Sequence, residues 1–151
     1  MRRRQTMPRQ WLIIADPSDR DAVAAAFRLP RGSGILLLQP LSGREMRRLR
    51  QSARNRGLTI AKEQRRAAAR VHNARELRRA LLARTPLILL SPLYPTSSHP
   101  DRKPIPRMRA AALARLGGRK LVALGGMDAR KYARIKRLGF QRWAGISAFR
   151  T

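Results

Sequence analysis

The sequence predicts an α/β protein built on a parallel sheet. Short apolar runs, typical of strands buried on both faces, alternate along the chain with segments that carry apolar residues at helical spacing. Alternation of this kind indicates strand–helix–strand units, whose strands run parallel. Up to seven such strands fit into the 151 residues, whereas a complete eightfold barrel needs about 200 residues or more.

The first half of the chain is expected to form two strand–helix units and a third strand. Ser18 or Asp19 can cap the first helix, and Ser42 can cap the second. In the second helix, Met46 and Leu49 lie at helical spacing on the side that we expect to be buried. The expected strands are residues 11–15, 35–38 and 58–61, and the expected helices are residues 21–27 and 42–55.

The connection after the third strand departs from this pattern. Only residues 62–68 separate it from the next candidate strand. A parallel crossover through a helix needs about a dozen residues or more. Either a β/α unit is missing at this point, or the connection is not a standard crossover.

The second half is expected to contain four strands and three helices. Asn73 can cap the first of these helices and Asp128 the last. We expect Met108, Ala112 and Leu116 to form the buried stripe of the middle helix. The expected strands are residues 69–72, 87–91, 121–124 and 143–146, and the expected helices are residues 74–84, 107–116 and 129–138.

The composition is strongly basic. The chain has 35 basic and 8 acidic residues, a net charge of +27, and 30 of the basic residues are arginines. Such a surface attracts polyanions, so non-specific binding of nucleic acid is one expectation. The alternative is that the arginines only cover exposed helix faces, because they are spread over every helix. With no cysteine and two histidines, thiolate metal sites are excluded and a zinc site is not expected.

We expect residues 1–10 to form a basic, flexible arm and residues 11–151 to form a single domain. The arginines at the start resemble the charged region of a signal peptide, but the apolar run that follows ends at Asp16 and is too short for one. No apolar stretch approaches the length of a membrane span. The expected location is the cytoplasm, without a membrane partner.

Polar side chains gather in residues 87–100. Leu87 to Leu90 are typical of a buried strand, which Pro92 cannot continue because it has no N–H to donate. The loop after it carries four hydrogen-bonding side chains, at residues 96–99. In α/β folds, ligands bind at this end of the strands. An ordinary surface loop is the alternative interpretation.

Two further strand ends could join the same site. Gly125-Gly126 follows a core strand, and the absence of Cβ atoms would let a phosphate approach backbone N–H groups. Ile146-Ser147 follows the last strand, and in β/α barrels the loops after the last two strands often bind phosphate. Glycine is also common in ordinary strand–helix turns, so this sequence pattern has a purely structural interpretation as well.

The two histidines have different expected roles. His72 ends the strand before residues 87–91 and could act as a general acid or base, because the pKa of a histidine is normally near neutrality. The alternative is that it only forms hydrogen bonds at the start of a helix. His99 lies in the polar loop and is expected to contact a ligand.

Three motifs, in this order and spacing, resemble one known family. They are LLSPLYPTSSHP at 89–100, LVALGGM at 121–127 and WAGISAF at 143–149. They are similar to the C-terminal half of the thiamine phosphate synthase/TenI family, over residues 71–149. Members of that family are parallel β/α barrels of the TIM type. The resemblance therefore implies a shortened or incomplete barrel of about six to seven strands, in a protein of thiamine biosynthesis.

The resemblance also implies roles for matching positions. Thr96 and Ser98 match hydroxyl groups that bind pyrophosphate and thiazole phosphate, and His99 replaces a lysine of the family. His72 matches the histidine that serves as the base in the TenI-type thiazole tautomerases. The expected site thus has His72 as the catalytic residue, no metal ligand, and the following residues around the phosphorylated substrate: Thr96, Ser98, His99, Gly125, Gly126, Ile146 and Ser147.

Other positions depart from the family. An Asn-Asp pair is replaced by Lys62-Glu63, a serine is replaced by Arg70, and the cations expected after Gln39 are missing. The strand that carries the second magnesium-binding aspartate is the unit that we infer to be missing. These departures predict a dismantled magnesium–pyrophosphate site. No cofactor is expected unless synthase activity survives, which would require magnesium.

Three functions remain open from the sequence. The first is a transferase that couples a pyrimidine diphosphate to thiazole phosphate. The second is an isomerase of the thiazole tautomerase type, which needs a proton-transferring base and no metal. The third is a non-catalytic protein that binds a phosphorylated ligand or nucleic acid. The expected partner is a small phosphorylated heterocycle, and the sequence leaves a homodimer open.

Overall fold

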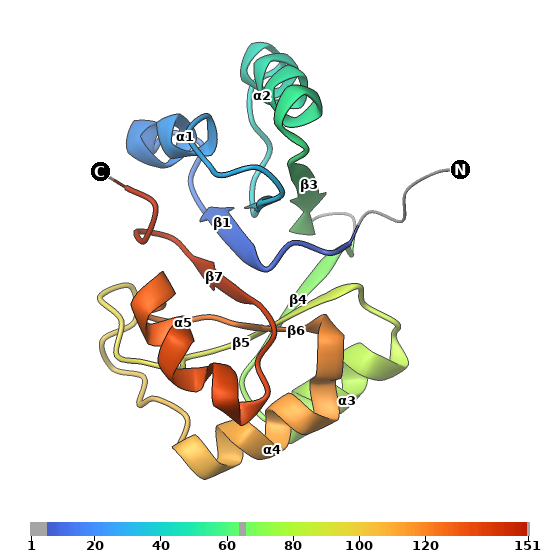
Figure 1. Ribbon diagram of the computed structural model, residues 1–151, viewed down its shortest axis with the longest axis vertical. Coiled ribbons are helices and arrows are strands. Elements are labelled where there is room, and N and C mark those ends of the chain that lie inside the picture. Colours follow the sequence, from blue (N-terminus) through green and yellow to red (C-terminus); the bar gives the residue numbers. More distant parts are fainter. Residues whose placement is uncertain (1–5, 64–65, 151) are drawn as a thin grey trace.

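The computed structural model describes residues 6–63 and 66–150, which form strands and helices in the predicted alternation (Figure 1). The strands are β1 (Gln10–Ile14), β2 (Gly34–Leu37), β3 (Thr59–Lys62), β4 (Ala68–Val71), β5 (Leu87–Leu90), β6 (Leu121–Ala123) and β7 (Trp143–Gly145). The α-helices are α1 (Arg20–Ala26), α2 (Gly43–Arg56), α3 (Ala74–Leu82), α4 (Arg107–Gly117) and α5 (Ala129–Ile135). Each strand lies within one or two residues of its expected position.

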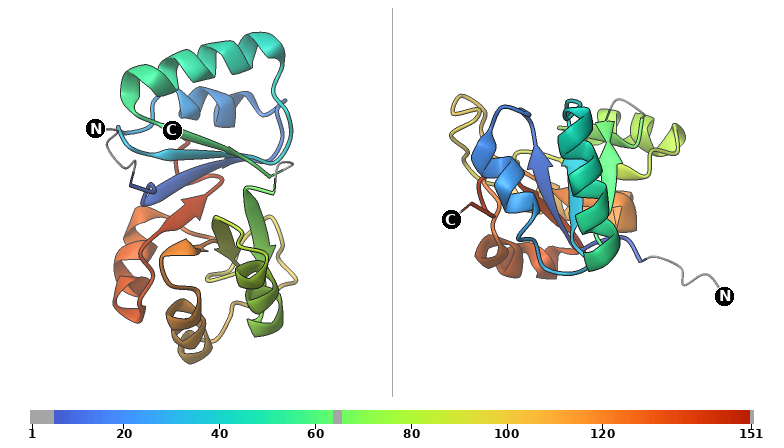
Figure 2. Two further views of the ribbon diagram at one scale, coloured as in Figure 1. Left: turned by 90° about the vertical axis from the view of Figure 1, so that its right-hand side faces the viewer. Right: turned by 90° about the horizontal axis from the view of Figure 1, so that it is seen from above.

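The seven strands form one sheet in the order β3-β2-β1-β7-β6-β5-β4, and every neighbouring pair is parallel. The sheet curls into a partial barrel with the helices outside (Figures 1 and 2). In a closed barrel β3 and β4 would be bonded, but here they are the two edges. The predicted shortened β/α barrel is therefore confirmed, and its opening lies where the sequence has too few residues for a crossover.

A small hollow of about 230 Å³ lies beside the starts of the two edge strands. It is lined by Thr59 and Ala61 of β3, by Ala67 next to β4, and by Met7 and Pro8 from the start of the described chain. Pro8 is buried. The segment just before β1 thus packs against the sheet. Of the arm expected over residues 1–10, residues 1–5 lie outside the described part.

The inside of the curled sheet is filled by apolar side chains around Trp11. Trp11 is 2% exposed, and its Nε1 donates a hydrogen bond to the carbonyl of Pro8 at 3.1 Å. A Cβ atom at Gly34, opposite Trp11 in the β1–β2 register, would lie 2.3 Å from the indole ring. Gly34 therefore provides the space that the indole occupies inside the barrel.

The helices cover the outside of the sheet in two groups. α1 and α2 pack against β1 and β2, where Met46, Leu49 and Ala53 are buried as expected. α3, α4 and α5 pack against the strands of the other half. Four helices have the side-chain N-caps that the sequence predicts: Asp19, Ser42, Asn73 and Asp128, each accepting a hydrogen bond from a backbone N–H three residues later.

The predicted buried face of α4 is wrong. Met108 is 82% exposed and Leu116 is 43% exposed. The buried residues are instead Ala110, Leu113, Ala114 and Gly117, the i, i+3, i+4 and i+7 positions of another stripe. Small residues face the sheet because α4 packs closely there: a Cβ atom at Gly117 would lie 2.8 Å from the Leu121 side chain.

No helix in the described part of the chain is long and apolar enough to cross a membrane.

Candidate functional site

A cavity of about 550 Å³ lies at the carboxyl ends of the strands. All eight residues that the sequence analysis assigned to a site line it: His72, Thr96, Ser98, His99, Gly125, Gly126, Ile146 and Ser147. They follow β4, β5, β6 and β7, four strands that are neighbours in the sheet. The fold therefore brings together residues that are up to 75 positions apart in the sequence.

The loops after β5 and β6 are bonded to each other. The N–H of Leu93 donates to the carbonyl of Leu124 at 2.9 Å, and the N–H of Tyr94 donates to the carbonyl of Gly125 at 3.1 Å. A Cβ atom at Gly126 would lie 2.3 Å from the Pro95 carbonyl oxygen. Gly126 also has a φ of +60°. Contact with the neighbouring loop is thus the main reason for glycine here, which agrees with the structural interpretation of the Gly125-Gly126 pair.

Two backbone donors remain available in this region. Within residues 6–63 and 66–150, no acceptor is bonded to the N–H of Gly126 or of Ser147. The carbonyl of Gly126, by contrast, accepts from Lys131 Nζ at 2.7 Å. This ammonium group lies 5.3 Å from the centre of the Tyr94 ring, so it fixes the two loops together.

The imidazole of His72 is bonded on both sides. Nδ1 lies 3.0 Å from Glu76 Oε2, which also accepts from the backbone N–H of His72 at 2.8 Å. Nε2 lies 2.6 Å from Nη1 of Arg102. Because arginine only donates, Nε2 must be the acceptor, and Nδ1 carries the proton that goes to Glu76. Nε2, the nitrogen with the acceptor lone pair, therefore faces Arg102.

The contact with His72 lowers the pKa of Glu76. The backbone N–H and the imidazole of His72 both bond to its carboxylate and hold the pKa of Glu76 below its ordinary value. The same two bonds fix the orientation of the ring. Glu76, which sequence reasoning did not single out, is thus the positioning residue for His72; its place four residues after His72, in the first turn of α3, was the available signal.

Arg70 and Glu63 form an ion pair at the opening of the barrel. Arg70 Nε lies 2.9 Å from Glu63 Oε1, and a second nitrogen lies 3.4 Å from Oε2. Glu63 follows β3 and Arg70 lies in β4, so the pair joins the two sheet edges. A carboxylate engaged in this way by a guanidinium is poorly suited to bind a metal ion. No group of three potential metal ligands is found among the described residues.

The lining of the cavity is cationic. Arg70, Arg102 and Arg150 all line it, and none of the eight acidic residues of the chain does. Arg150 forms an ion pair with Asp19 outside the cavity. Sequence reasoning did not select Arg102 or Arg150, because nothing in the local sequence distinguishes these two from the other arginines among the 30. Their presence favours an anionic ligand.

Comparisons with family models and with solved structures both find similar proteins. The family model of thiamine monophosphate synthase matches residues 53–149, which reaches further toward the N-terminus than the three motifs do. Among solved structures, the thiamine phosphate pyrophosphorylase of Pyrococcus furiosus superposes with a TM-score of 0.71 over 95% of this chain and 88% of that one, at 15% sequence identity. No curated protein sequence matches the chain.

Proposed function

The chain belongs to the thiamine monophosphate synthase family, and we propose that its cavity binds the phosphate ester of a thiazole or of a related small heterocycle of thiamine biosynthesis. The observation that carries this proposal is the lining of the cavity: three arginines, several hydroxyl groups, and no carboxylate. Arg70 and Arg150 are paired with Glu63 and Asp19, which lie outside the lining, so a phosphate would chiefly offset the charge of Arg102. A magnesium ion would find no carboxylate ligand in the lining.

The phosphate would bind between the loops after β6 and β7. The free N–H groups of Gly126 and Ser147 lie on the two loops, and a backbone donor to a phosphate oxygen forms a charge-assisted hydrogen bond. Thr96 and Ser98 line the same cavity from the loop after β5. The heterocycle would then extend toward His72, on the neighbouring strand end.

We propose proton transfer at His72 as the chemistry of this site. Nε2 of His72 would take a proton from one ring atom of the heterocycle and return it to another, so that the net change is an isomerisation without an added reactant. Arg102 must leave Nε2 for this to occur. Its side chain is exposed and lines the same cavity, so it can turn to a bound phosphate instead.

Binding can be tested by thermal shift with three ligands: the thiazole phosphate, the same thiazole without phosphate, and a pyrimidine diphosphate with and without magnesium. We expect the thiazole phosphate alone to raise the melting temperature, and magnesium to add nothing. If the unphosphorylated thiazole raises the melting temperature to the same extent, the cavity does not recognise the phosphate group. Chelator-sensitive coupling of the two substrates would show that synthase chemistry survives.

The chemistry can be tested with His72→Asn, which keeps much of the shape but cannot accept a proton on the ring. Binding of thiazole phosphate should stay within a few-fold, and the tautomerisation rate should fall by about 10²–10⁴-fold. Ser147→Ala, which keeps the backbone N–H, is the matched control on the phosphate side and should retain both. Equal rates in His72→Asn and the parent protein would contradict the catalytic role.

A nucleic-acid-binding function would use the net charge of +27 and not the cavity. We therefore expect duplex DNA to bind weakly, without sequence preference, and to dissociate steeply as salt rises. Tight binding at physiological salt would favour that function over the small ligand.

A further inference from the structure

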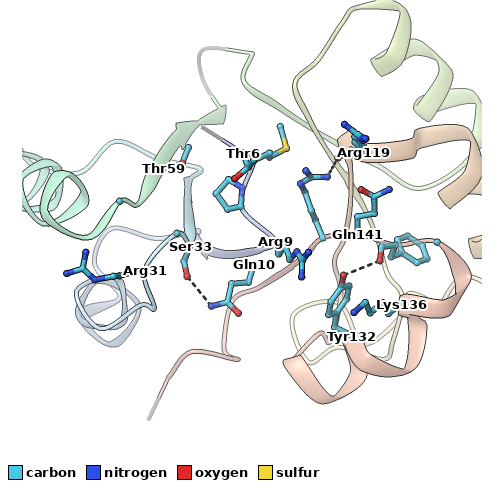
Figure 3. Close-up of a pocket in the computed structure, with 17 residues that line it drawn as sticks. Thr6, Arg9, Gln10, Arg31, Ser33, Thr59, Arg119, Tyr132, Lys136 and Gln141 are labelled. Atoms are coloured by element: carbon cyan, nitrogen blue, oxygen red, sulfur yellow. Dashed lines mark hydrogen bonds between the residues drawn. The ribbon is translucent and has the colours of Figure 1, made fainter. Parts of the chain in front are cut away.

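A second, larger cavity lies at the opposite end of the strands. Its volume is about 1100 Å³, and it shares no lining residue with the candidate site. It is formed by segments that precede strands, including residues 6–9 before β1, residues 31–33 before β2 and residues 139–142 before β7 (Figure 3). In β/α barrels this face normally serves stability and not ligand binding.

Five cationic side chains line this second cavity, and none of the eight acidic residues of the chain does. They come from separate parts of the sequence: Arg9, Arg31, Arg119, Lys136 and Arg142. Figure 3 shows Arg31 on one side of the cavity, Arg119 and Lys136 on the other, and Arg9 between them. The positive charge is thus distributed around the hollow and not concentrated at one point.

Arg142 is the most constrained of the five. Its Nη1 donates to the carbonyl of Arg119, while its Nε is buried and has no hydrogen-bond partner among the described residues. Burial lowers the pKa of Arg142, and the neighbouring Arg119 and Arg9 lower it further. These cations are close enough to repel one another, and no carboxylate of the cavity offsets the repulsion.

The phenol of Tyr132, which also lines the cavity, is influenced by the same arginines. Tyr132 donates to the carbonyl of Phe140 at 3.2 Å, and burial raises its pKa while Arg9 and Arg142 oppose the rise. Arg9 and Arg142 thus both act on Tyr132, which lines the cavity with them. Elsewhere in the described chain, arginines such as Arg20 and Arg70 are paired with glutamates. The second cavity concentrates cations without such pairs.

We propose that the second cavity is a binding site for an oligophosphate, a ligand with two or more linked phosphate groups. Several cations spread over a wide hollow match several linked anionic groups better than one phosphate. The volume lies just above the range of about 300–1,000 Å³ that is usual for small-ligand pockets. The cavity therefore has room for a chain of linked phosphate groups. The ligand phosphates could be inorganic or belong to a nucleotide.

The test is calorimetric titration with inorganic tripolyphosphate at about 0.15 M salt, where charges more than about 8 Å apart are largely screened. The informative variant is Arg9→Gln with Lys136→Gln, because both side chains are exposed and no side-chain hydrogen bond of either contributes to the described fold. The matched control is Arg78→Gln with Arg115→Gln. Both arginines are exposed and lie outside both cavities, and the two substitutions remove the same amount of charge as the informative pair.

We expect the first double variant to weaken tripolyphosphate binding at least about tenfold, because it removes two charge-assisted contacts to the phosphates. The control should change it less than about twofold. Equal losses in both variants, or no binding by the parent protein, would overturn the proposal. So would inorganic phosphate binding as tightly as tripolyphosphate.

Two further titrations identify the source of the phosphates. A nucleoside triphosphate that binds more tightly than tripolyphosphate, with the same sensitivity to Arg9→Gln and Lys136→Gln, would identify a nucleotide ligand within the proposal. A single-stranded RNA that outcompetes both, with equal losses in the informative and control variants, would replace the pocket with a diffuse nucleic-acid surface and contradict it.

Discussion

The contact between the loops after β5 and β6 predicts a specific result for Gly126→Ala. Gly126 has a φ of +60°, and Gly57, at the end of α2, has a φ of +63°. An alanine costs about 1–2 kcal/mol in this left-handed conformation at either position. A Cβ atom at Gly57 meets nothing within 4 Å, whereas a Cβ atom at Gly126 lies 2.3 Å from the Pro95 carbonyl oxygen.

The difference between the two variants isolates that contact. Overpacking of a well-ordered region costs about 1–3 kcal/mol. We therefore expect Gly57→Ala to lower the free energy of unfolding by about 1–2 kcal/mol and Gly126→Ala to lower it by about 2–5 kcal/mol. Replacing glycine by alanine also lowers the conformational entropy of the unfolded chain, which stabilises the folded state. This effect is similar for the two substitutions and cancels in the comparison. Urea denaturation of both variants measures the difference.

The same variants test the site. The loop after Pro95 carries Thr96 and Ser98, so displacing the Pro95 carbonyl should also displace the hydroxyl groups that line the cavity. Stabilisation by thiazole phosphate should persist in Gly57→Ala and be lost in Gly126→Ala. If both variants lose equal stability and both still bind the ligand, the loops are not held together as described and the reasoning fails.

Two further results follow from contacts in the fold. Trp11→Ala should lower the free energy of unfolding by about 3–5 kcal/mol, because it leaves a cavity inside the barrel. The destabilisation by Gly34→Ala should nearly vanish in the Trp11→Ala background, because the indole ring that the new Cβ atom would meet is then absent. Strictly additive effects in urea denaturation would contradict the contact between the two residues. The pKa of Glu76 lies below its ordinary value of 4.5, so its stabilisation is present above about pH 4.5 and is lost as the pH falls through the folded-state pKa. The difference in the free energy of unfolding between Glu76→Gln and the parent protein is expected to be under about 1 kcal/mol for so exposed a pair. This difference should shrink between pH 5 and pH 3, and a constant difference would show that the carboxylate of Glu76 does not provide the stabilisation.

Much of the fold was predictable because its signals are local. Proline, glycine and capping residues mark the ends of the strands and helices, so Asp19, Ser42, Asn73 and Asp128 were found as caps. The opening of the barrel was also predictable, because the length of residues 62–68 is itself a physical constraint. The face of α4 was not: its buried Ala110 and Ala114 are less hydrophobic than the exposed Met108, and only the closeness of the helix to the sheet explains the choice.

The candidate site was predictable in position but not in charge. Strand ends that are neighbours in a parallel sheet meet at one edge, so His72, Thr96 and Ser147 could be placed together before the structure was known. The contact between Arg102 and His72 could not, because Arg102 is 30 positions away, in a segment without regular structure. The second cavity also escaped prediction, since its cations come from five unrelated segments.

The ion pair across the barrel opening provides a last prediction about the site. Where the missing β/α unit would lie, Glu63 at one sheet edge neutralises Arg70 at the other, and Arg70 lines the candidate cavity. Glu63→Gln would leave that guanidinium free to attract a phosphate, while the exposed fractions of 50% and 23% limit the effect. We expect Glu63→Gln to tighten thiazole phosphate binding about two- to fivefold and Arg70→Gln to weaken it by a similar factor, since each change is worth under about 1 kcal/mol. The double variant should resemble Arg70→Gln, because Glu63 acts on the ligand only through its partner. A Glu63→Gln variant that binds less tightly would instead show that the carboxylate itself contacts the ligand or a metal ion, and the site would then retain part of the metal chemistry that the closed ion pair argues against.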